Sequence, residues 1–305
     1  MNIFVTGSRG FLGKFLCERL IELGHFVIGV HSQNCDLRQK ESLSQFDGVK
    51  FDQIFHLAAW TQAGDFCLFH PGEQWLINQQ INSNVLAWWQ SRQPQAKMIA
   101  IGTSCGYDPG LPFEEGYYLQ GSPIESLYTY GMTKRMLLIG LMALQKQFGL
   151  EYLYFIPSTL YGPLYHSDGR KMHFIFDLIR KILRGKLYGE EVSLWGDGEQ
   201  KRELVYVRDF VEIMLQLVPN QKNRSLNIGA GQEYSIKRFA EMICSQVGYS
   251  HEKICYDLSK YVGARSKILS VEKLQMLMPE YKMRDLQQGL AETIDWFLEQ
   301  RERFL

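Results

Sequence analysis

Apolar and polar residues follow one another along the first half of the chain as short apolar runs and longer stretches with helical spacing. Short apolar runs bounded by turn residues are typical of buried strands, and apolar residues with a period of about 3.6 are typical of helices. The pattern predicts strands at Ile3–Thr6, Phe26–Val30, Asp52–Leu57, Met98–Ile101 and Tyr152–Ile156, and helices at Leu12–Leu23, Trp75–Trp89 and Leu127–Phe148. Strands that alternate with such helices form a parallel sheet with helices on both faces.

The pattern changes after Pro163, where glycine-rich turns join helices and shorter strands. Helices are predicted at Phe174–Leu183, Phe210–Leu217, Ile236–Val247 and Leu286–Glu302, and strands near Val192–Trp195, Leu204–Val207 and Ser225–Ile228. We therefore predict an α/β fold with a Rossmann-type, doubly wound parallel sheet over residues 1–162 and a smaller mixed α/β substrate lobe over residues 163–305. Some later strands and helices are expected to return to the first domain, with a cleft between the two lobes.

The predicted helix Leu127–Phe148 is apolar on more than one face. Such a helix must bury a second side, either in the core or against another subunit. Together with the helix that carries Trp88 and Trp89, it predicts a homodimer with a two-fold four-helix interface, in which the two tryptophans lie at the subunit contact.

Composition narrows the class of protein. The 305 residues carry 33 Lys and Arg against 33 Asp and Glu, and zero net charge argues against nucleic-acid or anionic-membrane partners, which require clustered positive charge. No apolar run is long enough to cross a bilayer, and the chain starts directly with a strand, so we expect a cytoplasmic protein. The 6 cysteines show neither paired nor metal-ligand spacing, and His166 with Asp168 lacks a third ligand, so we predict reduced thiols and no metal site.

Glycines follow the first predicted strand and open the first helix. Gly7, Gly10 and Gly13 have the spacing GxxGxxG. A tight turn, close approach of the backbone to a pyrophosphate and close helix–sheet packing each favour a residue without a β-carbon, and the helix start offers free N–H groups. The position in a βαβ unit favours a dinucleotide site over a plain tight turn.

The residues after the second strand indicate which dinucleotide binds. An NAD-type site usually has an acid at the end of this strand, but here the strand is followed by His31, Ser32 and Gln33. Arg9 lies inside the glycine turn, where its guanidinium can pair with a 2′-phosphate. We therefore favour NADP (as NADPH) over NAD, which stays possible. Asp36 either reaches the adenine or caps its loop.

Tyr130 and Lys134 stand 4 residues apart, so both project from one face of their helix. A neighbouring ammonium should lower the high pKa of the phenol and make it a usable proton donor to an alkoxide, and the lysine can also hold the nicotinamide ribose. Thr103 follows a strand at the edge where α/β sheets bind ligands, and its hydroxyl would bind the same substrate oxygen. Taken alone, the Tyr–Lys spacing also fits an ordinary solvated helix face.

These motifs together resemble a known family. The glycine turn, His56-Leu57-Ala58-Ala59, the Thr103/Tyr130/Lys134 set, Leu160-Tyr161-Gly162-Pro163 and the stretch Arg202–Asp209 look like an extended short-chain dehydrogenase/reductase of the NAD(P)-dependent nucleotide-sugar epimerase/dehydratase family. Thr103-Ser104-Cys105-Gly106-Tyr107 and Met172–Ile175 make the GDP-L-fucose synthase family, which are GDP-4-keto-6-deoxy-mannose 3,5-epimerase/4-reductases, the most similar branch.

The resemblance implies a set of functional residues. The catalytic residues would be Tyr130, Lys134, Thr103, Cys105 and His173, with Cys105 and His173 as base and acid of epimerisation. The cofactor-binding residues would be Gly7, Arg9, Gly10, Phe11, Leu12, Gly13, Asp36, Leu57, Ala58, Lys134, Pro157 and Leu160. The nucleotide-sugar substrate would be bound by Lys181, Trp195, Arg202 and Lys267.

Two proton-transfer groups are what epimerisation beside a ketone requires, since a proton leaves one face of the ring and another returns to the opposite face. A cysteine with a lowered pKa and a histidine suit these roles. The alternative is a small buried Cys105 and a helix-capping or core His173.

The chain also departs from that branch. Thr159 stands where the family has Asn, Thr103 replaces a serine, and Trp60-Thr61-Gln62-Ala63-Gly64 replaces Lys-Val-Gly-Gly beside the expected sugar site. We therefore expect NADPH-dependent reduction of a nucleotide-linked 4-keto-6-deoxy sugar, with or without prior C3/C5 epimerisation. A C4 reductase of a GDP-6-deoxy-4-keto-heptose, a redox-neutral 4-epimerase with tightly bound NAD, and a non-catalytic dinucleotide sensor are the alternatives.

Overall fold

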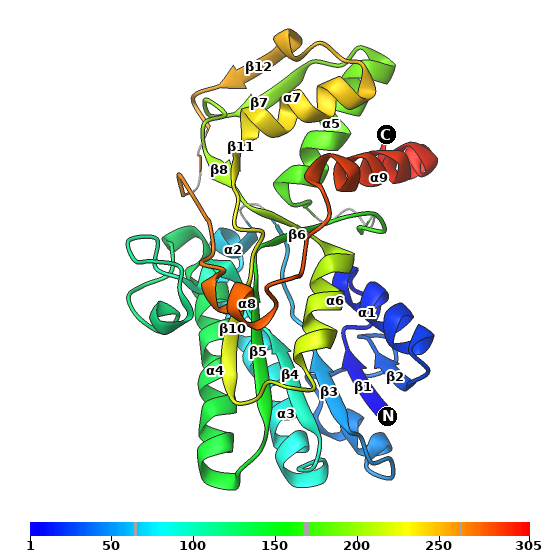
Figure 1. Cartoon of the computed structure of the whole chain (residues 1–305), viewed down its shortest axis with the longest axis vertical. Helices are drawn as coiled ribbons and strands as arrows, with labels where there is room; N and C mark the ends of the chain where they lie inside the picture. The colour runs from blue at the N-terminus through cyan, green and yellow to red at the C-terminus, as the bar shows by residue number, and fades with distance from the viewer. Residues whose placement is uncertain (64–65, 167–170, 261, 263) are drawn as a thin grey trace.

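The fold is built around one six-stranded sheet, shown in the lower part of the computed structural model in Figure 1. The structure describes residues 1–63, 66–166, 171–260, 262 and 264–305. The strands are all parallel, in the order β10-β5-β4-β3-β1-β2. They span β1 (Asn2–Thr6), β2 (Phe26–Val30), β3 (Gln53–His56), β4 (Lys97–Ile101), β5 (Tyr152–Pro157) and β10 (Arg224–Ile228). The predicted Rossmann-type fold class is confirmed.

The order of strands reverses at β1, which pairs with β2 on one side and with β3 on the other. In open α/β sheets, ligands bind outside the carboxyl ends of the strands at such a switch point. The residues that follow Thr6 in β1 and His56 in β3 therefore lie where a cofactor is expected.

Helices cover both faces of the sheet. On one face α1 (Phe11–Glu22) and α6 (Val207–Leu217) enclose an apolar core, and on the other α3 (Pro71–Arg92) and α4 (Tyr128–Phe148) enclose a second one. The shorter helical elements are η1 (Lys40–Phe46), α2 (Phe66–Phe69), η2 (Ser104–Gly106), η3 (Glu115–Tyr117), η4 (Glu125–Leu127), η5 (His251–Lys253) and α8 (Glu272–Leu277). The two-faced covering explains why the inner strands β1, β3, β4 and β5 consist almost entirely of buried residues.

A smaller lobe with its own apolar core lies above the sheet in Figure 1. Its helices are α5 (Phe174–Tyr188), α7 (Ile236–Val247), α9 (Leu286–Glu299) and α10 (Arg301–Phe304), and its outer strands are β7 (Val192–Trp195) and β12 (Ile254–Asp257). Two further strand pairs complete the structure: β6 (Thr159–Tyr161) with β9 (Leu204–Tyr206), and β8 (Lys201–Arg202) with β11 (Tyr234–Ser235).

The chain crosses between the two parts more than once. β10 and α6 come late in the sequence, yet they belong to the main sheet and its covering layer. The single helix predicted over Leu286–Glu302 is wrong: α9 ends at Glu299, and a short α10 follows after Gln300.

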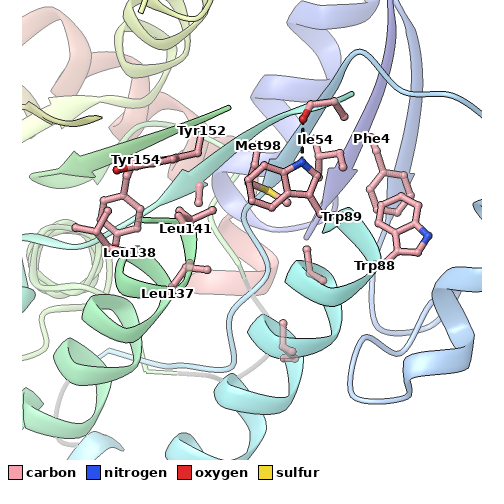
Figure 2. Close-up of a cluster of buried hydrophobic side chains, with 14 of the residues drawn as sticks. Phe4, Ile54, Trp88, Trp89, Met98, Leu137, Leu138, Leu141, Tyr152 and Tyr154 are labelled. Atoms are coloured by element: carbon pink, nitrogen blue, oxygen red, sulfur yellow. Dashed lines mark hydrogen bonds between the residues drawn. The ribbon is translucent and has the colours of Figure 1, made fainter. Parts of the chain in front are cut away.

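The prediction that Trp88 and Trp89 lie at a subunit contact is also wrong. Both indoles are buried in the core between α3 and the sheet, as Figure 2 shows. The centroid of the Trp88 ring lies 5.0 Å from the centroid of the Phe4 ring. The indole N–H of Trp88 donates to Asp47 Oδ1 at 2.9 Å, and the indole N–H of Trp89 donates to the Ala96 carbonyl at 2.8 Å. The aromatic neighbours and a hydrogen-bond acceptor for each indole N–H make the interior the more stable place. In the described part of the chain, no helix is long and apolar enough to span a membrane.

Candidate active site

The glycine turn after β1 packs directly against the end of β3. Gly7 has φ of +69°, and a β-carbon there would lie 3.0 Å from the backbone nitrogen of Ala58. A β-carbon on Gly13 would lie 2.2 Å from the Gly7 carbonyl oxygen. Side chains at these two positions would therefore fill the space between the turn, the helix and β3.

The start of α1 is free to bind an anion. Its N-cap, Gly10, has no side chain to satisfy the first N–H groups, and the first turn contains no acidic residue. Unsatisfied N–H groups and the positive end of the helix dipole suit a pyrophosphate. The residues present therefore fit a dinucleotide. Phe11, however, turns its ring away to pack against Tyr165 and Phe176 of the smaller lobe, so only its backbone can face such a ligand. Leu12 is the next residue of α1 and is half-buried.

The ends of β1 and β3 are tied together by a buried polar group. The Thr6 hydroxyl accepts hydrogen bonds from the backbone N–H groups of Leu57 and Ala58, both at 3.1 Å, and lies 2.9 Å from His56 Nδ1. His56 Nε2 lies 3.0 Å from Asn82 Oδ1. Burial, and to a smaller degree the charge of Lys134, lower the pKa of His56 to about 4, so the ring is neutral near pH 7.

Arg9 brings a positive charge to the end of β2. Arg9 reaches across from the glycine turn and donates to Gln33 Oε1 at 2.8 Å. Desolvation first, and then the charge of Arg9, lower the pKa of His31. Asp36 is occupied by Arg38, which donates to its carboxylate through the backbone and the guanidinium, as the loop-capping alternative requires.

Tyr130 and Lys134 lie one turn apart on α4 and face the carboxyl end of β4. Lys134 is buried, its Nζ donates to the Ile101 carbonyl at 2.9 Å and lies 6.0 Å from the centroid of the Tyr130 ring. Desolvation lowers the pKa of Lys134 to about 8. The pair is therefore turned toward the sheet edge, and the solvated helix face considered from the sequence is not what the structure has.

The expected effect of Lys134 on Tyr130 is not found. Burial of the hydroxyl raises the pKa of Tyr130 above its ordinary value, and a hydrogen bond with the Thr103 side chain lowers it by a smaller amount. Desolvation outweighs charge because the phenolate would lose its water without gaining a close cation. The phenol therefore keeps its proton near neutral pH, which is the form that a proton donor needs.

Two buried tyrosines, which sequence reasoning missed, support this pair. Tyr154 donates to the Lys134 carbonyl at 2.8 Å and lies 3.3 Å from the Tyr118 hydroxyl, which accepts the Thr103 N–H at 3.4 Å. Thr103 in turn accepts the Cys105 N–H at 3.2 Å. No local motif marks Tyr118 and Tyr154, because their roles come from contacts between distant segments.

Cys105 and Lys267 are brought together from positions 162 residues apart. Lys267 Nζ lies 3.7 Å from Cys105 Sγ. His173 stands directly before α5. Desolvation of its ring first, and then the charges of His166 and Lys267, lower its pKa. Lys267 is therefore in electrostatic reach of both residues of the predicted epimerisation pair.

The other three predicted substrate contacts lie on the smaller lobe. Lys181 on α5 donates to the Ser193 carbonyl of β7 at 3.1 Å and pairs with Asp177. Trp195 ends β7 with 52% of its surface exposed. Arg202 in β8 donates to the Ala264 carbonyl at 2.7 Å. The Lys181 contact joins α5 to β7, and the Arg202 contact joins β8 to the chain near Ala264.

Glu203 is a further residue whose role the sequence did not reveal, although it lies in the stretch that carried the family resemblance. It is buried, and its carboxylate accepts the backbone N–H groups of Gly231 at 2.8 Å and Leu269 at 3.1 Å. Burial raises its pKa. A buried carboxylate that binds backbone N–H groups fixes the paths of several segments at once.

Two predicted cofactor-binding residues and the question of a metal site remain. Pro157 ends β5 and Leu160 lies half-buried in β6, near the carboxyl edge of the sheet. Asp168 lies outside the described residues. Among the residues that are described, no group of three His, Cys, Asp or Glu side chains could hold a metal ion.

Comparisons with known proteins show the family and the fold. The sequence model of the NAD dependent epimerase/dehydratase family matches residues 3–229. A GDP-L-fucose synthase of Azorhizobium caulinodans is 27% identical over 97% of this chain and 96% of its own length. A GDP-L-colitose synthase of Yersinia pseudotuberculosis is 28% identical over 99% of each chain. The structure of a GDP-L-fucose synthetase from Naegleria fowleri bound to NADP has a TM-score of 0.87, at 24% identity over 99% of this chain and 95% of that chain.

Proposed function

Because this chain belongs to the NAD dependent epimerase/dehydratase family, we propose that it reduces the ketone of a nucleotide-linked 4-keto-6-deoxy sugar with NADPH. One observation carries the proposal: Tyr130, hydrogen-bonded to Thr103, and Lys134, bound to the Ile101 carbonyl, lie together at the carboxyl edge of the sheet. A binding module without chemistry has no need of a phenol and an ammonium held together at this edge.

The cofactor wall favours NADPH. The glycine turn and the uncapped start of α1 would hold the pyrophosphate, and Arg9 beside Gln33 would pair with the 2′-phosphate. Lys134 would hold the nicotinamide ribose. When bound, NADPH supplies the two electrons that convert the ketone into an alcohol.

Tyr130 would supply the proton. Reduction of a ketone develops negative charge on its oxygen, and a phenol within hydrogen-bonding reach neutralises that charge by passing its proton. Thr103 would bind the same oxygen and orient it. The phenolate that remains on Tyr130 would then take a proton from solvent.

Cys105 and His173 would exchange protons at C3 and C5 before the reduction. The ketone at C4 acidifies both neighbouring C–H bonds. The Cys105 thiolate would take a proton from one face, with the C–H electron pair moving toward the ketone oxygen. His173, which has a lowered pKa and is neutral near pH 7, would first take a proton from solvent and then pass it to the other face. This step is the part of the proposal that rests most on the resemblance to GDP-L-fucose synthases.

A GDP-linked sugar is favoured as the substrate. The two relatives compared above are named for GDP-L-fucose and GDP-L-colitose, and Lys181, Trp195 and Arg202 would face the nucleotide and its phosphates. The sugar itself differs between those relatives, and this chain has its own sequence from Trp60 to Gly64. A GDP-6-deoxy-4-keto-heptose is therefore a second substrate to test.

We also propose that two copies pair through α3 and α4. The two helices pack side by side, and apolar residues remain exposed on both: Trp75 and Leu76 on α3, and Ile139 and Met142 on α4. A second copy related by a two-fold axis would bury these side chains in a four-helix interface. Light scattering of the purified protein should give twice the mass of the chain.

The experiment is to mix the purified protein with GDP-4-keto-6-deoxy-mannose and NADPH in heavy water. We expect NADPH oxidation together with deuterium at C3 and C5 of the product. Oxidation without deuterium would support a pure C4 reductase. No oxidation with any of the 4-keto sugars tested would refute the reductase.

The competing function is a redox-neutral 4-epimerase that recycles a tightly held NAD. It predicts one NAD released per chain when the protein, purified without added cofactor, is denatured. The Arg9 guanidinium at the end of β2 favours NADPH, so we expect no such NAD.

A further inference from the structure

The contact between Lys267 and Cys105 has no role in the reaction as described so far. Lys267 Nζ lies 3.7 Å from Cys105 Sγ, within the distance at which an ammonium donates a hydrogen bond to sulfur. Cys105 is half-buried in η2, directly after the strand that leads to Thr103, and Lys267 is half-buried as well. The resemblance to other enzymes placed Lys267 among the nucleotide-sugar contacts, which is a different role.

The backbone that carries Lys267 is anchored on both sides. Before it, the carbonyls of Ala264 and Arg265 accept hydrogen bonds from the Arg202 guanidinium at 2.7 Å and from the Lys201 N–H at 2.8 Å. After it, the Leu269 N–H donates to the buried Glu203 carboxylate at 3.1 Å. A backbone segment that is held by hydrogen bonds on both sides therefore places the Lys267 ammonium beside the Cys105 thiol.

Lys267 is the charged member of the groups around the thiol. Cys105 interacts electrostatically with Tyr130, Tyr118 and Cys67. Burial raises the pKa of each of these three groups, of Tyr118 to about 12, so they stay protonated and neutral near pH 7. A lysine ammonium is charged at this pH. The local field on Cys105 from these four groups is therefore that of one cation.

We propose that Lys267 is a positioning residue that stabilises the Cys105 thiolate and so prepares it to act as the base of epimerisation. On deprotonation the sulfur keeps the S–H electron pair, the proton goes to solvent, and Lys267 keeps its own protons. The thiolate then forms a new S–H bond with the proton taken from the sugar. Cationic neighbours favour thiolates in this way in reactive cysteine sites.

The catalytic part of this inference rests on the proposed function, but the thiolate part does not need a substrate. The test measures the rate at which iodoacetamide alkylates Cys105, by peptide mass spectrometry, from pH 5 to pH 10. The unliganded wild type is compared with Lys267→Met, Lys267→Gln and Lys267→Arg. Cys255, which is exposed on the smaller lobe, is the internal control in every sample.

We expect alkylation of Cys105 at pH 7 to fall about 10-fold in Lys267→Met and Lys267→Gln, with the midpoint of its pH–rate profile moved to higher pH. Lys267→Arg should restore most of the rate, and Cys255 should not change. Unaltered NADPH affinity shows that each variant is folded. An unchanged Cys105 profile in a folded Met or Gln variant would overturn the proposal.

Deuterium exchange separates this inference from the proposed function. If the function is right, exchange at C3 and C5 by Lys267→Met should fall about 10-fold at pH 7 and recover toward the wild-type rate at higher pH. If the wild type shows no exchange while Lys267 still controls alkylation, the epimerisation is refuted and the thiolate role stands. Equal loss of exchange at every pH would indicate a substrate contact alone and contradict the catalytic part.

Discussion

The two walls of the candidate site are built in different ways. On the sheet wall, the side chains of Thr6, Thr103 and Lys134 each form a hydrogen bond with a backbone group at or just after the end of a strand. On the wall formed by the smaller lobe, Trp195 is half exposed and Lys181 reaches out on a long, partly exposed side chain. The first wall is fixed by the backbone, and the second depends on individual side chains.

This difference separates chemistry from recognition. Proton transfer requires tightly fixed distances, which strand ends and buried hydrogen bonds provide. A nucleotide sugar can be bound by separate side chains, each of which can be substituted without displacing the others. We therefore expect substitutions on the sheet wall to affect rate and stability strongly, and substitutions on the lobe wall to affect substrate affinity moderately.

The largest effect is expected at Tyr130. Tyr130→Phe removes the proton donor while keeping the ring, so the rate of ketone reduction should fall about 10²- to 10⁴-fold. The affinity for NADPH should stay unchanged, as measured by fluorescence titration. Tyr128→Phe, at an exposed position on the same helix, is the matched control and should keep the wild-type rate. Turnover by Tyr130→Phe at the wild-type rate would contradict a role of the sheet wall in the chemistry.

The second prediction concerns pH and the buried His56. Its pKa is about 4 in the folded protein and 6.5 ordinarily, so between these values the unfolded chain binds more protons and stability falls as the pH drops. From pH 7 to pH 5 this group should lower the unfolding free energy by about 2 kcal/mol, a factor of about 30 in the equilibrium constant. Urea unfolding at both pH values should show a smaller loss for His56→Gln. Equal losses would show that His56 is not the buried neutral base described here.

The third prediction places cofactor choice on the sheet wall. Arg9→Ala should reduce the preference for NADPH over NADH about 10-fold, because it removes a charged hydrogen-bond donor to the 2′-phosphate. The ratio of kcat/KM for the two cofactors measures this directly. Arg19→Ala, which removes a partly exposed cation from α1, the helix that follows the glycine turn, should leave the ratio unchanged. A similar loss in both variants would indicate only a general effect of charge.

The smallest effect is expected on the lobe wall. Trp195→Ala should raise KM for the GDP-sugar about 5-fold through loss of stacking on the base, and leave kcat nearly unchanged. Leu258→Ala, at another exposed apolar residue of the same lobe, is the control and should change neither constant. A fall in kcat as large as that of Tyr130→Phe would contradict the claim that the sheet wall controls the rate and the lobe wall controls substrate affinity.

The sheet wall was also the more predictable from the sequence. The glycine turn, the helix carrying Tyr130 and Lys134, and the strands around them are local patterns, and the structure has each within one or a few residues of the predicted bounds. Spacing along a helix determines which side chains share a face. It does not determine what that face meets, which is why burial rather than Lys134 controls the pKa of Tyr130.

Contacts between distant segments could not be predicted. Trp88 and Trp89 are adjacent in sequence and both pack inward, because one contacts Phe4 and Asp47 and the other reaches the Ala96 carbonyl. The Lys267–Cys105 contact and the anchoring by Glu203 likewise join separate parts of the chain. Such pairings depend on the assembled fold, and no pattern in a single sequence marks them.

The most direct test of the account is a crystal structure of the protein with NADP⁺ and a GDP-sugar. The account predicts the Tyr130 and Thr103 hydroxyls about 3 Å from the C4 oxygen of the sugar, with Lys134 on the nicotinamide ribose and Arg9 on the 2′-phosphate. A coenzyme bound with its nicotinamide far from Tyr130 and Lys134 would contradict it.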